Sequence, residues 1–169
     1  MASTRTAFLD RLLQAFQRYY NISRENVTSP FVAEAAFHSN SEQYFLFKSA
    51  KLSDAESHEY IFIASEEHLD LADAERLDRL AWETGLSRVT PHGGHRNTDI
   101  TLILLADTID PQAMALVQKT RRYKSYRHMF HGWSDYRLVA LELSTGQLAY
   151  NRKGQSLKKL FGNILSSLE

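Results

Sequence analysis

The feature that most constrains the fold of this chain is an almost unbroken apolar segment near its middle. Residues 100–106 read ITLILLA, in which Thr101 is the only polar side chain. Seven residues cannot span a membrane, whereas a short run of this kind is typical of a central strand that is covered on both faces. The sequence therefore predicts a β-sheet with this strand at its centre.

Four segments carry apolar residues at three- and four-residue spacing, which is the pattern of an amphipathic helix. Their expected first residues are Ser3 or Thr4, Asp70, Asp110 and Ser156. Because Asp110 is followed by Pro111, the third helix has a strong start signal, and it is expected to reach about Lys124. Gly85 stands where the second helix would end in a left-handed residue.

Strand-like segments alternate with these helices, which predicts one sheet covered by helices. The expected strands are residues 44–52, 58–65, 98–107, 136–143 and 148–151, and the last two form a hairpin. Residues 31–38 fit either structure. We therefore expect a mixed α/β (α+β) fold, with a single domain, a mixed sheet of about five strands flanked by helices, and helical elements at both termini. Within this domain, residues 1–40 are expected to form an N-terminal helical extension and residues 41–169 an α/β core.

The composition limits the classes of function. The 169 residues include no cysteine, which excludes disulfides, thiol catalysis and cysteine-ligated metal sites and fits a cytoplasmic location. Twenty basic and twenty acidic residues balance, so the surface as a whole is not an electrostatic footprint for nucleic acid. The first six residues lack the apolar core of a signal peptide, and we expect no membrane contact. The composition allows a homodimer but specifies no oligomeric state.

The loop at residues 88–98 concentrates polar groups directly before the central strand. Arg88 can grip a phosphate or carboxylate in a bidentate fork, and His92 or His95 can transfer protons near neutral pH. Two glycines let the backbone approach a ligand closely. Alternatively, the loop is only a polar connection whose glycines serve the turn. The candidate ligand-binding residues here are Arg88, His92 and Thr98, and His95 is a candidate catalytic residue.

A second candidate site is the basic and aromatic segment at residues 119–133, KTRRYKSYRHMFHGW. Basic groups neutralise phosphates and aromatic rings stack on bases, so the segment suits single-stranded nucleic acid. Alternatively, its cations complement the dipole of the preceding helix and its rings belong to the core. Because the net charge is zero, nucleic acid is not the favoured partner. Lys124 and Trp133 are candidate ligand-binding residues, and His131 is a candidate catalytic residue.

Metal and nuclease chemistry are weaker alternatives. His92 and His95, like His128 and His131, have the spacing His-x-x-His, but the first pair flanks two glycines, and we assign no metal or cofactor. A restriction-enzyme-like nuclease needs an acidic residue two positions before a lysine, and the sequence contains none.

Glu59 or Asp99 with a displaced lysine keeps the nuclease hypothesis open. On the expected strand pair, Lys48 and Glu59 can form a cross-strand ion pair or a tuned acid and base. Glu59 is therefore a third candidate catalytic residue, and Lys48 is a further candidate ligand-binding residue.

Several segments together resemble a family of bacterial proteins of unknown function. They are FLFKSAKL, HEYIFI, GLSRVTPHGGHRNTDIT and YKSYRHMFHGW, and the resemblance covers about residues 42–160. The resemblance implies a bacterial cytosolic protein and supplies no substrate, cofactor or partner.

The favoured function is binding or conversion of a small phosphate- or carboxylate-bearing ligand at Arg88, His95, Lys124 and His131. The alternative is an interaction module that recognises nucleic acid or another protein through residues 119–133, and a divergent nuclease is the third hypothesis. Whether the protein is an enzyme stays open. If the strands that follow the two histidine segments are parallel neighbours, both segments lie at one end of the sheet and line one pocket.

Overall fold

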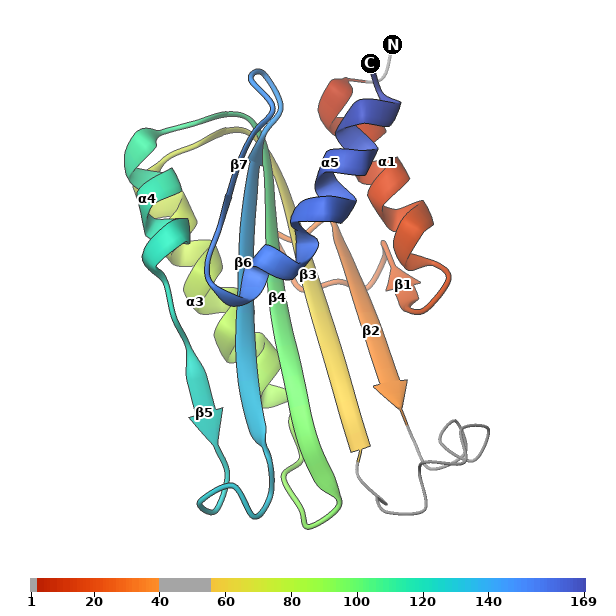
Figure 1. Cartoon of the computed structure of the whole chain (residues 1–169), viewed down its shortest axis with the longest axis vertical. Helices are drawn as coiled ribbons and strands as arrows, with labels where there is room; N and C mark the ends of the chain where they lie inside the picture. The colour runs from red at the N-terminus through yellow and green to blue at the C-terminus, as the bar shows by residue number, and fades with distance from the viewer. Residues whose placement is uncertain (1–2, 40–55) are drawn as a thin grey trace.

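The computed structural model describes residues 3–39 and 56–169, which form one mixed α+β domain. Its elements are α1 (Thr4–Phe16), β1 (Asn21–Ser23), β2 (Ala33–Ser39), β3 (Glu56–Leu69), α3 (Leu71–Ser87), β4 (His95–Ile109), α4 (Pro111–Lys119), β5 (Tyr123–Ser125), β6 (Trp133–Glu142), β7 (Gln147–Tyr150), the 3₁₀ helix η2 (Lys153–Leu157) and α5 (Lys158–Ser167). Figure 1 shows the strands as one sheet with helices packed against it.

The sheet has seven strands in the order β1-β2-β3-β4-β6-β5, and β7 pairs with β6. Strands β3, β4 and β6 are parallel neighbours, whereas all the other pairs are antiparallel. The apolar run at residues 100–106 lies in β4 at the centre, as the sequence predicts. The expectation of about five strands was too low, partly because β1 and β5 have only three residues each and lack a strand pattern.

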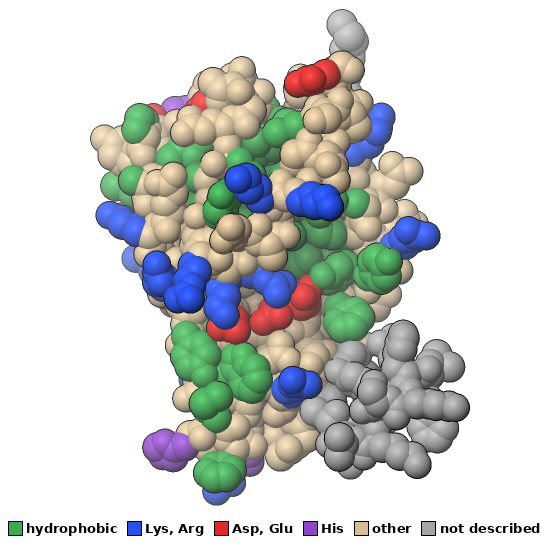
Figure 2. Space-filling model, in the orientation of Figure 1, with side chains coloured by type: hydrophobic (Ala, Val, Ile, Leu, Met, Phe, Trp, Pro, Cys, Tyr) green, Lys and Arg blue, Asp and Glu red, His purple; other side chains and the backbone are tan. Residues whose placement is uncertain are grey.

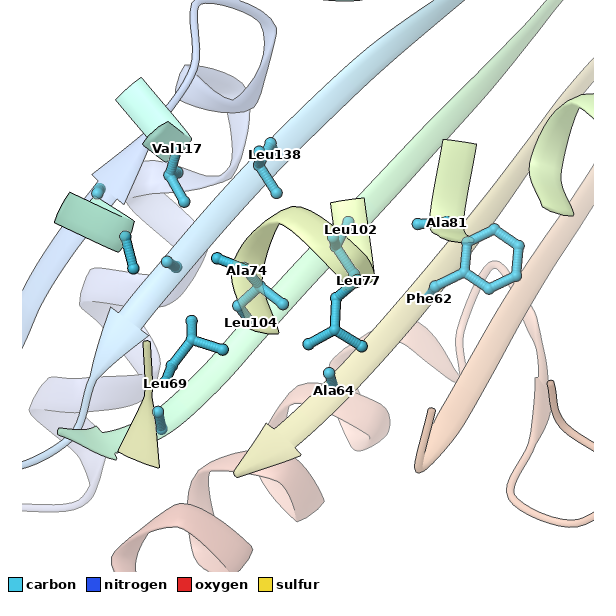
Figure 3. Packing of buried hydrophobic residues seen from close by; sticks show 14 of the residues in the cluster. Phe62, Ala64, Leu69, Ala74, Leu77, Ala81, Leu102, Leu104, Val117 and Leu138 are labelled. Carbon is cyan, nitrogen blue, oxygen red and sulfur yellow. The ribbon is translucent and has the colours of Figure 1, made fainter. Parts of the chain in front are cut away.

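One face of the sheet is covered by α3 and α4. Figure 3 shows side chains of both helices packed on alternate residues of the strands. They include Ala74, Leu77 and Ala81 of α3, Val117 of α4, and Phe62, Leu102, Leu104 and Leu138 of the sheet. The intervening strand residues point to the opposite face, so both faces of β4 are buried.

The opposite face is covered by α1 and α5, which lie side by side in Figure 1. Phe8 of α1 and Phe161 of α5 are fully buried, and their ring centroids are 5.2 Å apart. Both pack over Ile103 and Val139. Phe161 and Ile164 are the buried residues of α5, while Leu157, Leu160 and Leu168 are only partly buried beside them.

Helix α3 begins as its sequence predicts and ends differently. The Asp70 side chain accepts a hydrogen bond from the Asp73 backbone amide at 2.8 Å, which is an N-cap. Gly85 is not a left-handed cap, because the helix continues to Ser87. A Cβ atom at Gly85 would lie 2.7 Å from the Ile100 side chain, so this glycine permits close helix–strand packing.

Two other boundaries differ from the sequence-based expectation. Helix α4 ends at Lys119 rather than near Lys124, and the chain then forms β5 along the edge of β6. Residues 21–39, which we grouped with the helical N-terminal segment, include β1 and β2 and belong to the sheet. The predicted strand at residues 44–52 lies outside the described residues. Within the part that is described, no helix is long and apolar enough to cross a membrane.

Candidate functional site

The polar candidates gather at the end of the sheet where the parallel strands begin. We call this region, residues 56–59, 95–99 and 133–135, the lower end of the sheet, as it appears in Figure 1. In that view, β3, β4 and β6 extend below α1 and α5. In this lower part of the three strands, beyond the helices, most side chains on both faces are polar, whereas those in the covered part are apolar.

The two histidine segments meet at this end, because β4 and β6 are parallel neighbours, which is the arrangement that the sequence left open. The Nδ1 atom of His95 donates a hydrogen bond to the backbone carbonyl oxygen of His131 at 2.6 Å. Gly132 has φ +82°, and a Cβ atom there would lie 2.1 Å from the Arg96 carbonyl oxygen. Only glycine therefore allows this close contact between the segments.

His95 is held from both ring nitrogens. Nδ1 donates to the His131 carbonyl oxygen, and Nε2 forms a second hydrogen bond with the Thr98 hydroxyl at 2.8 Å. The His95 side chain also lies edge-on to the Tyr126 ring. His95 is 4% exposed and Thr98 is fully buried, so this pair anchors the two segments rather than facing solvent.

A chain of accessible titratable groups lies beside His95. Nδ1 of His38 and Nδ1 of His58 are 2.7 Å apart, so one of the two rings is neutral and accepts the proton of the other. Glu56 Oε2 is 3.5 Å from Nε2 of His58 and 3.1 Å from Nε2 of His92. The His58 ring also stacks on His95 with centroids 6.2 Å apart.

These contacts change the proton affinities of the chain. Burial lowers the pKa of His58, and the neighbouring His38 lowers it further, against the opposing effect of Glu56. The hydrogen bond from His92 lowers the pKa of Glu56, and His58 contributes to the same shift. The neutral imidazole and the ionised carboxylate are therefore favoured together.

Arg88 is already engaged in the folded protein. Its guanidinium forms a 2.7 Å ion pair with the buried Glu34 and lies over the rings of Tyr60 and Phe62. Glu34 accepts a further hydrogen bond from the Thr28 backbone amide. Arg88 therefore ties the end of α3 to β2.

Lys124 and Trp133 point to opposite faces. Lys124 is exposed, and its ammonium lies 5.6 Å from the centre of the Tyr126 ring. Trp133 is half-buried on the other face, where its indole N–H donates to Asp135 at 3.2 Å. These two candidates cannot bind one small ligand from the same side of the sheet.

Glu59 belongs to a charged network on the α1 face, next to Asp99 in the strand register. Arg137 donates to Glu59 at 3.0 Å and to Asp99 at 3.1 Å, and the Tyr20 hydroxyl donates to Glu59. Burial raises the pKa of Asp99, and Glu59 adds to this against the opposing effect of Arg137. Arg137 and Tyr20 were not among the predicted site residues, since nothing in their local sequence marks them.

The remaining candidates bear on metal and nuclease chemistry. Lys48 lies outside the described residues, so the expected Lys48–Glu59 pair stays a prediction. Among residues 3–39 and 56–169, no group of three or more histidines or carboxylates is arranged to hold a metal ion.

The edge of β6 is interrupted between β5 and β7. Strand β5 pairs with residues 133–135 and β7 with residues 139–142, which leaves residues 136–138 without a neighbouring strand. The Asn151 amide fills this notch, because it accepts from the Leu138 backbone amide and donates to the carbonyl oxygens of Tyr136 and Thr120. One buried side chain thus replaces the missing strand contacts.

A basic cavity of about 320 Å³ opens at this notch. It is lined by Arg121, Arg122, Tyr123, Asp135, Tyr136, Asn151, Arg152 and Lys153. Figure 2 shows Lys and Arg side chains gathered at mid-height on the left of the molecule, with acidic and then hydrophobic side chains below them. The volume of the cavity is at the small end of the usual range for ligand pockets.

Below the cavity, a strained loop connects β5 and β6. Three consecutive residues, Arg127, His128 and Met129, have positive φ angles of 47°, 51° and 73°. Each left-handed non-glycine residue costs about 1–2 kcal/mol. The loop holds Phe130 82% exposed and Met129 55% exposed. Local strain together with exposed apolar groups is typical of a binding element.

The fold and these sites define a mixed α+β domain with a polar lower end and a basic notch in one sheet edge. The chain belongs to the family described as Domain of unknown function (DUF8052), whose model matches residues 4–163. Neither the curated proteins nor the solved structures contain a match to this chain.

Proposed function

We propose that this protein binds a small anionic ligand, carrying a phosphate or carboxylate group, in the basic cavity beside β5. The supporting observation is the position of Arg121 and Arg152. Both line the cavity, and neither has an ion-pair partner among residues 3–39 and 56–169. Guanidinium groups that line one cavity without acidic partners repel each other, and a bound anion relieves this repulsion.

The other lining residues support recognition of an anion. Arg122 is fixed by a bidentate contact with the buried Asp78, at 2.8 and 3.2 Å, so its position is set before any ligand arrives. Lys153 is 3.8 Å from Asp135, which is a weak contact that leaves its ammonium available. The exposed ring of Tyr123 provides an apolar wall for the rest of the ligand.

The proposal keeps the function expected from the sequence and changes its location. Arg88 and His95, which we expected to bind the anion, have partners within the protein, Glu34 for the first and His131 and Thr98 for the second. An anion would have to compete with these contacts. The cavity also has no histidine among its lining residues, so the proposal concerns binding rather than proton transfer.

A titration with pyrophosphate tests the proposal. We expect pyrophosphate to raise the melting temperature of the wild type, because a ligand that binds only the folded state stabilises it. The variants Arg121→Ala and Arg152→Ala should each lose most of this stabilisation, since a charge-assisted hydrogen bond contributes about 1.5–3 kcal/mol. Binding isotherms from calorimetry would give the affinities.

Arg79→Ala is the matched control, because Arg79 is an exposed arginine on α3 outside the cavity. It should keep the full pyrophosphate effect. If Arg121→Ala, Arg152→Ala and Arg79→Ala respond alike, the cavity is not the binding site.

The cellular setting is also part of the proposal. The resemblance noted from the sequence and the lack of cysteine support a bacterial protein of the cytoplasm. Fractionation of the native host, followed by immunodetection, would test the location.

A further inference from the structure

The cavity is lined by cations, whereas the surface next to it carries aromatic side chains. Tyr123 pairs in register with Asp135, and Ser125 pairs with Trp133. Side chains of paired residues share a face, so Tyr123 and Trp133 are diagonal neighbours on two adjacent strands. Tyr123 is 55% exposed and Trp133 is half-buried.

The cations and the rings belong to one strip, which is joined at Tyr123. Arg121, Arg152 and Lys153 line the cavity together with Tyr123, and β5 then leads to the strained loop with Phe130 at its tip. Figure 2 shows basic side chains on this face, with acidic side chains directly below them and hydrophobic side chains further down. Three of the five large hydrophobic residues with the greatest exposure in the described chain, Tyr123, Met129 and Phe130, belong to this strip.

We propose that the ligand of this strip is a short single strand of nucleic acid. This inference rests on the proposed anion-binding function and specifies the class of the ligand. The phosphates lie against Arg121, Arg152 and Lys153, and the bases stack on Tyr123, Trp133 and the loop tip at Phe130. A basic groove that continues into flat exposed rings is the arrangement that binds single strands without reading sequence.

The charge distribution favours this partner over an apolar protein surface. The chain is neutral as a whole, yet Arg121, Arg152 and Lys153 line the cavity against the single acidic lining residue Asp135, and the loop adds Arg127. Duplex DNA fits less well, because its bases are stacked on each other and offer no free face to the rings. Nucleic acid was not the partner favoured from the sequence, because the neutral net charge hides this local excess of positive charge.

Fluorescence anisotropy with a labelled six-nucleotide oligothymidylate tests the proposal. We expect the wild type to bind it more tightly than thymidine monophosphate or a duplex of the same length. Tyr123→Ala and Phe130→Ala should each weaken binding by about 5-fold to 150-fold, the loss expected for one stacked base. Both side chains are exposed, so the variants should fold. Tyr19→Ala, which removes another exposed tyrosine on the α1 side, should bind as the wild type does.

Two further readouts separate stacking from charge. Arg121→Ala should reduce the slope of log affinity against log salt by about 0.7, the value for one phosphate of a single strand. Oligothymidylate should quench the tryptophan fluorescence of the wild type more than that of Trp133→Phe, which retains only the buried Trp82. Pyrophosphate should quench neither protein.

The outcomes distinguish this inference from the anion site itself. If pyrophosphate binding depends on Arg121 but oligothymidylate binds no more tightly than thymidine monophosphate, the anion site stands and the nucleic-acid ligand is overturned. Equal affinities of Tyr123→Ala and Tyr19→Ala, or equal affinities for the single strand and the duplex, also overturn it. If neither pyrophosphate nor the oligonucleotide binds, both proposals fall.

Discussion

At the scale of single residues, the structure gives several candidates a structural task. Arg88 is the clearest case, because the sequence presents it as a ligand-binding arginine whereas the fold pairs it with Glu34, whose side chain is only 9% exposed. His95 is similar, since both of its ring nitrogens bind groups within the chain. Glu34 lies 54 residues from Arg88 and His131 lies 36 residues from His95, so neither partner leaves a local signal in the sequence.

Replacing Arg88 should therefore destabilise the protein even without a ligand. Arg88→Ala leaves the carboxylate of Glu34 buried without its cation, and we expect a loss of roughly 1–3 kcal/mol, between the values for exposed and for buried ion pairs. Urea denaturation measures the free energy of unfolding directly.

A double-mutant cycle with Glu34→Gln identifies the cause of that loss. The cost of Arg88→Ala should be clearly smaller in the Glu34→Gln background, because the uncompensated charge is then absent. An equal cost in both backgrounds would show that packing of Arg88 on Tyr60 and Phe62 dominates instead.

At the scale of elements, local sequence signals predicted where the helices start. They did not predict features that depend on contacts between elements far apart in the sequence. Asp70 caps α3 as predicted, since a cap depends on residues within one turn. The close approach of α3 to β4 at Gly85 depends on Ile100, fifteen residues away in the sequence. The cavity has the same origin, because Arg152 and Lys153 reach Arg121 only through the pairing of β5 and β7 with β6.

Two glycine substitutions in helices should have opposite effects. Gly162→Ala in α5 meets no atom within 4 Å and should stabilise the protein by about 0.5–1 kcal/mol through helix propensity. Gly85→Ala gains the same propensity, but its Cβ would lie 2.7 Å from the Ile100 side chain, and such overpacking costs about 1–3 kcal/mol. Thermal or urea unfolding of both variants checks the difference, and stabilisation by Gly85→Ala would show that α3 can move away from β4.

At the scale of the whole molecule, the sequence correctly predicted the mixed fold and the central strand, and it left open whether the two histidine segments meet. The pairing of β3 with β2 and with β4 places His58 beside His38 and His95, and burial together with His38 lowers the His58 pKa, which couples folding to pH. Because the folded-state pKa of His58 is lowered, the unfolded chain binds this proton more readily than the folded protein does. Stability is therefore present above the ordinary histidine pKa, near 6.5, and declines as the pH falls below it.

We expect the free energy of unfolding to fall from pH 7 to pH 5 by more in the wild type than in His58→Gln, which has no proton to bind. Glu56 has a lowered pKa and adds a second loss only below its ordinary range, near pH 4.5. Urea denaturation at several pH values tests this. Identical slopes for the two proteins between pH 7 and pH 5 would remove His58 as a source of the acid sensitivity.

The amide of Asn151 has a consequence for the solubility of the folded protein. An open strand edge is a template on which other chains can pair, and short edge strands and polar interruptions are the means by which proteins prevent this. Along β6, the short strands β5 and β7 cover the two ends, and Asn151 occupies the hydrogen-bonding groups between them. The same side chain that shapes the floor of the cavity thereby keeps the edge of β6 closed to growth into an intermolecular sheet, so a loss of Asn151 would favour aggregation as well as unfolding.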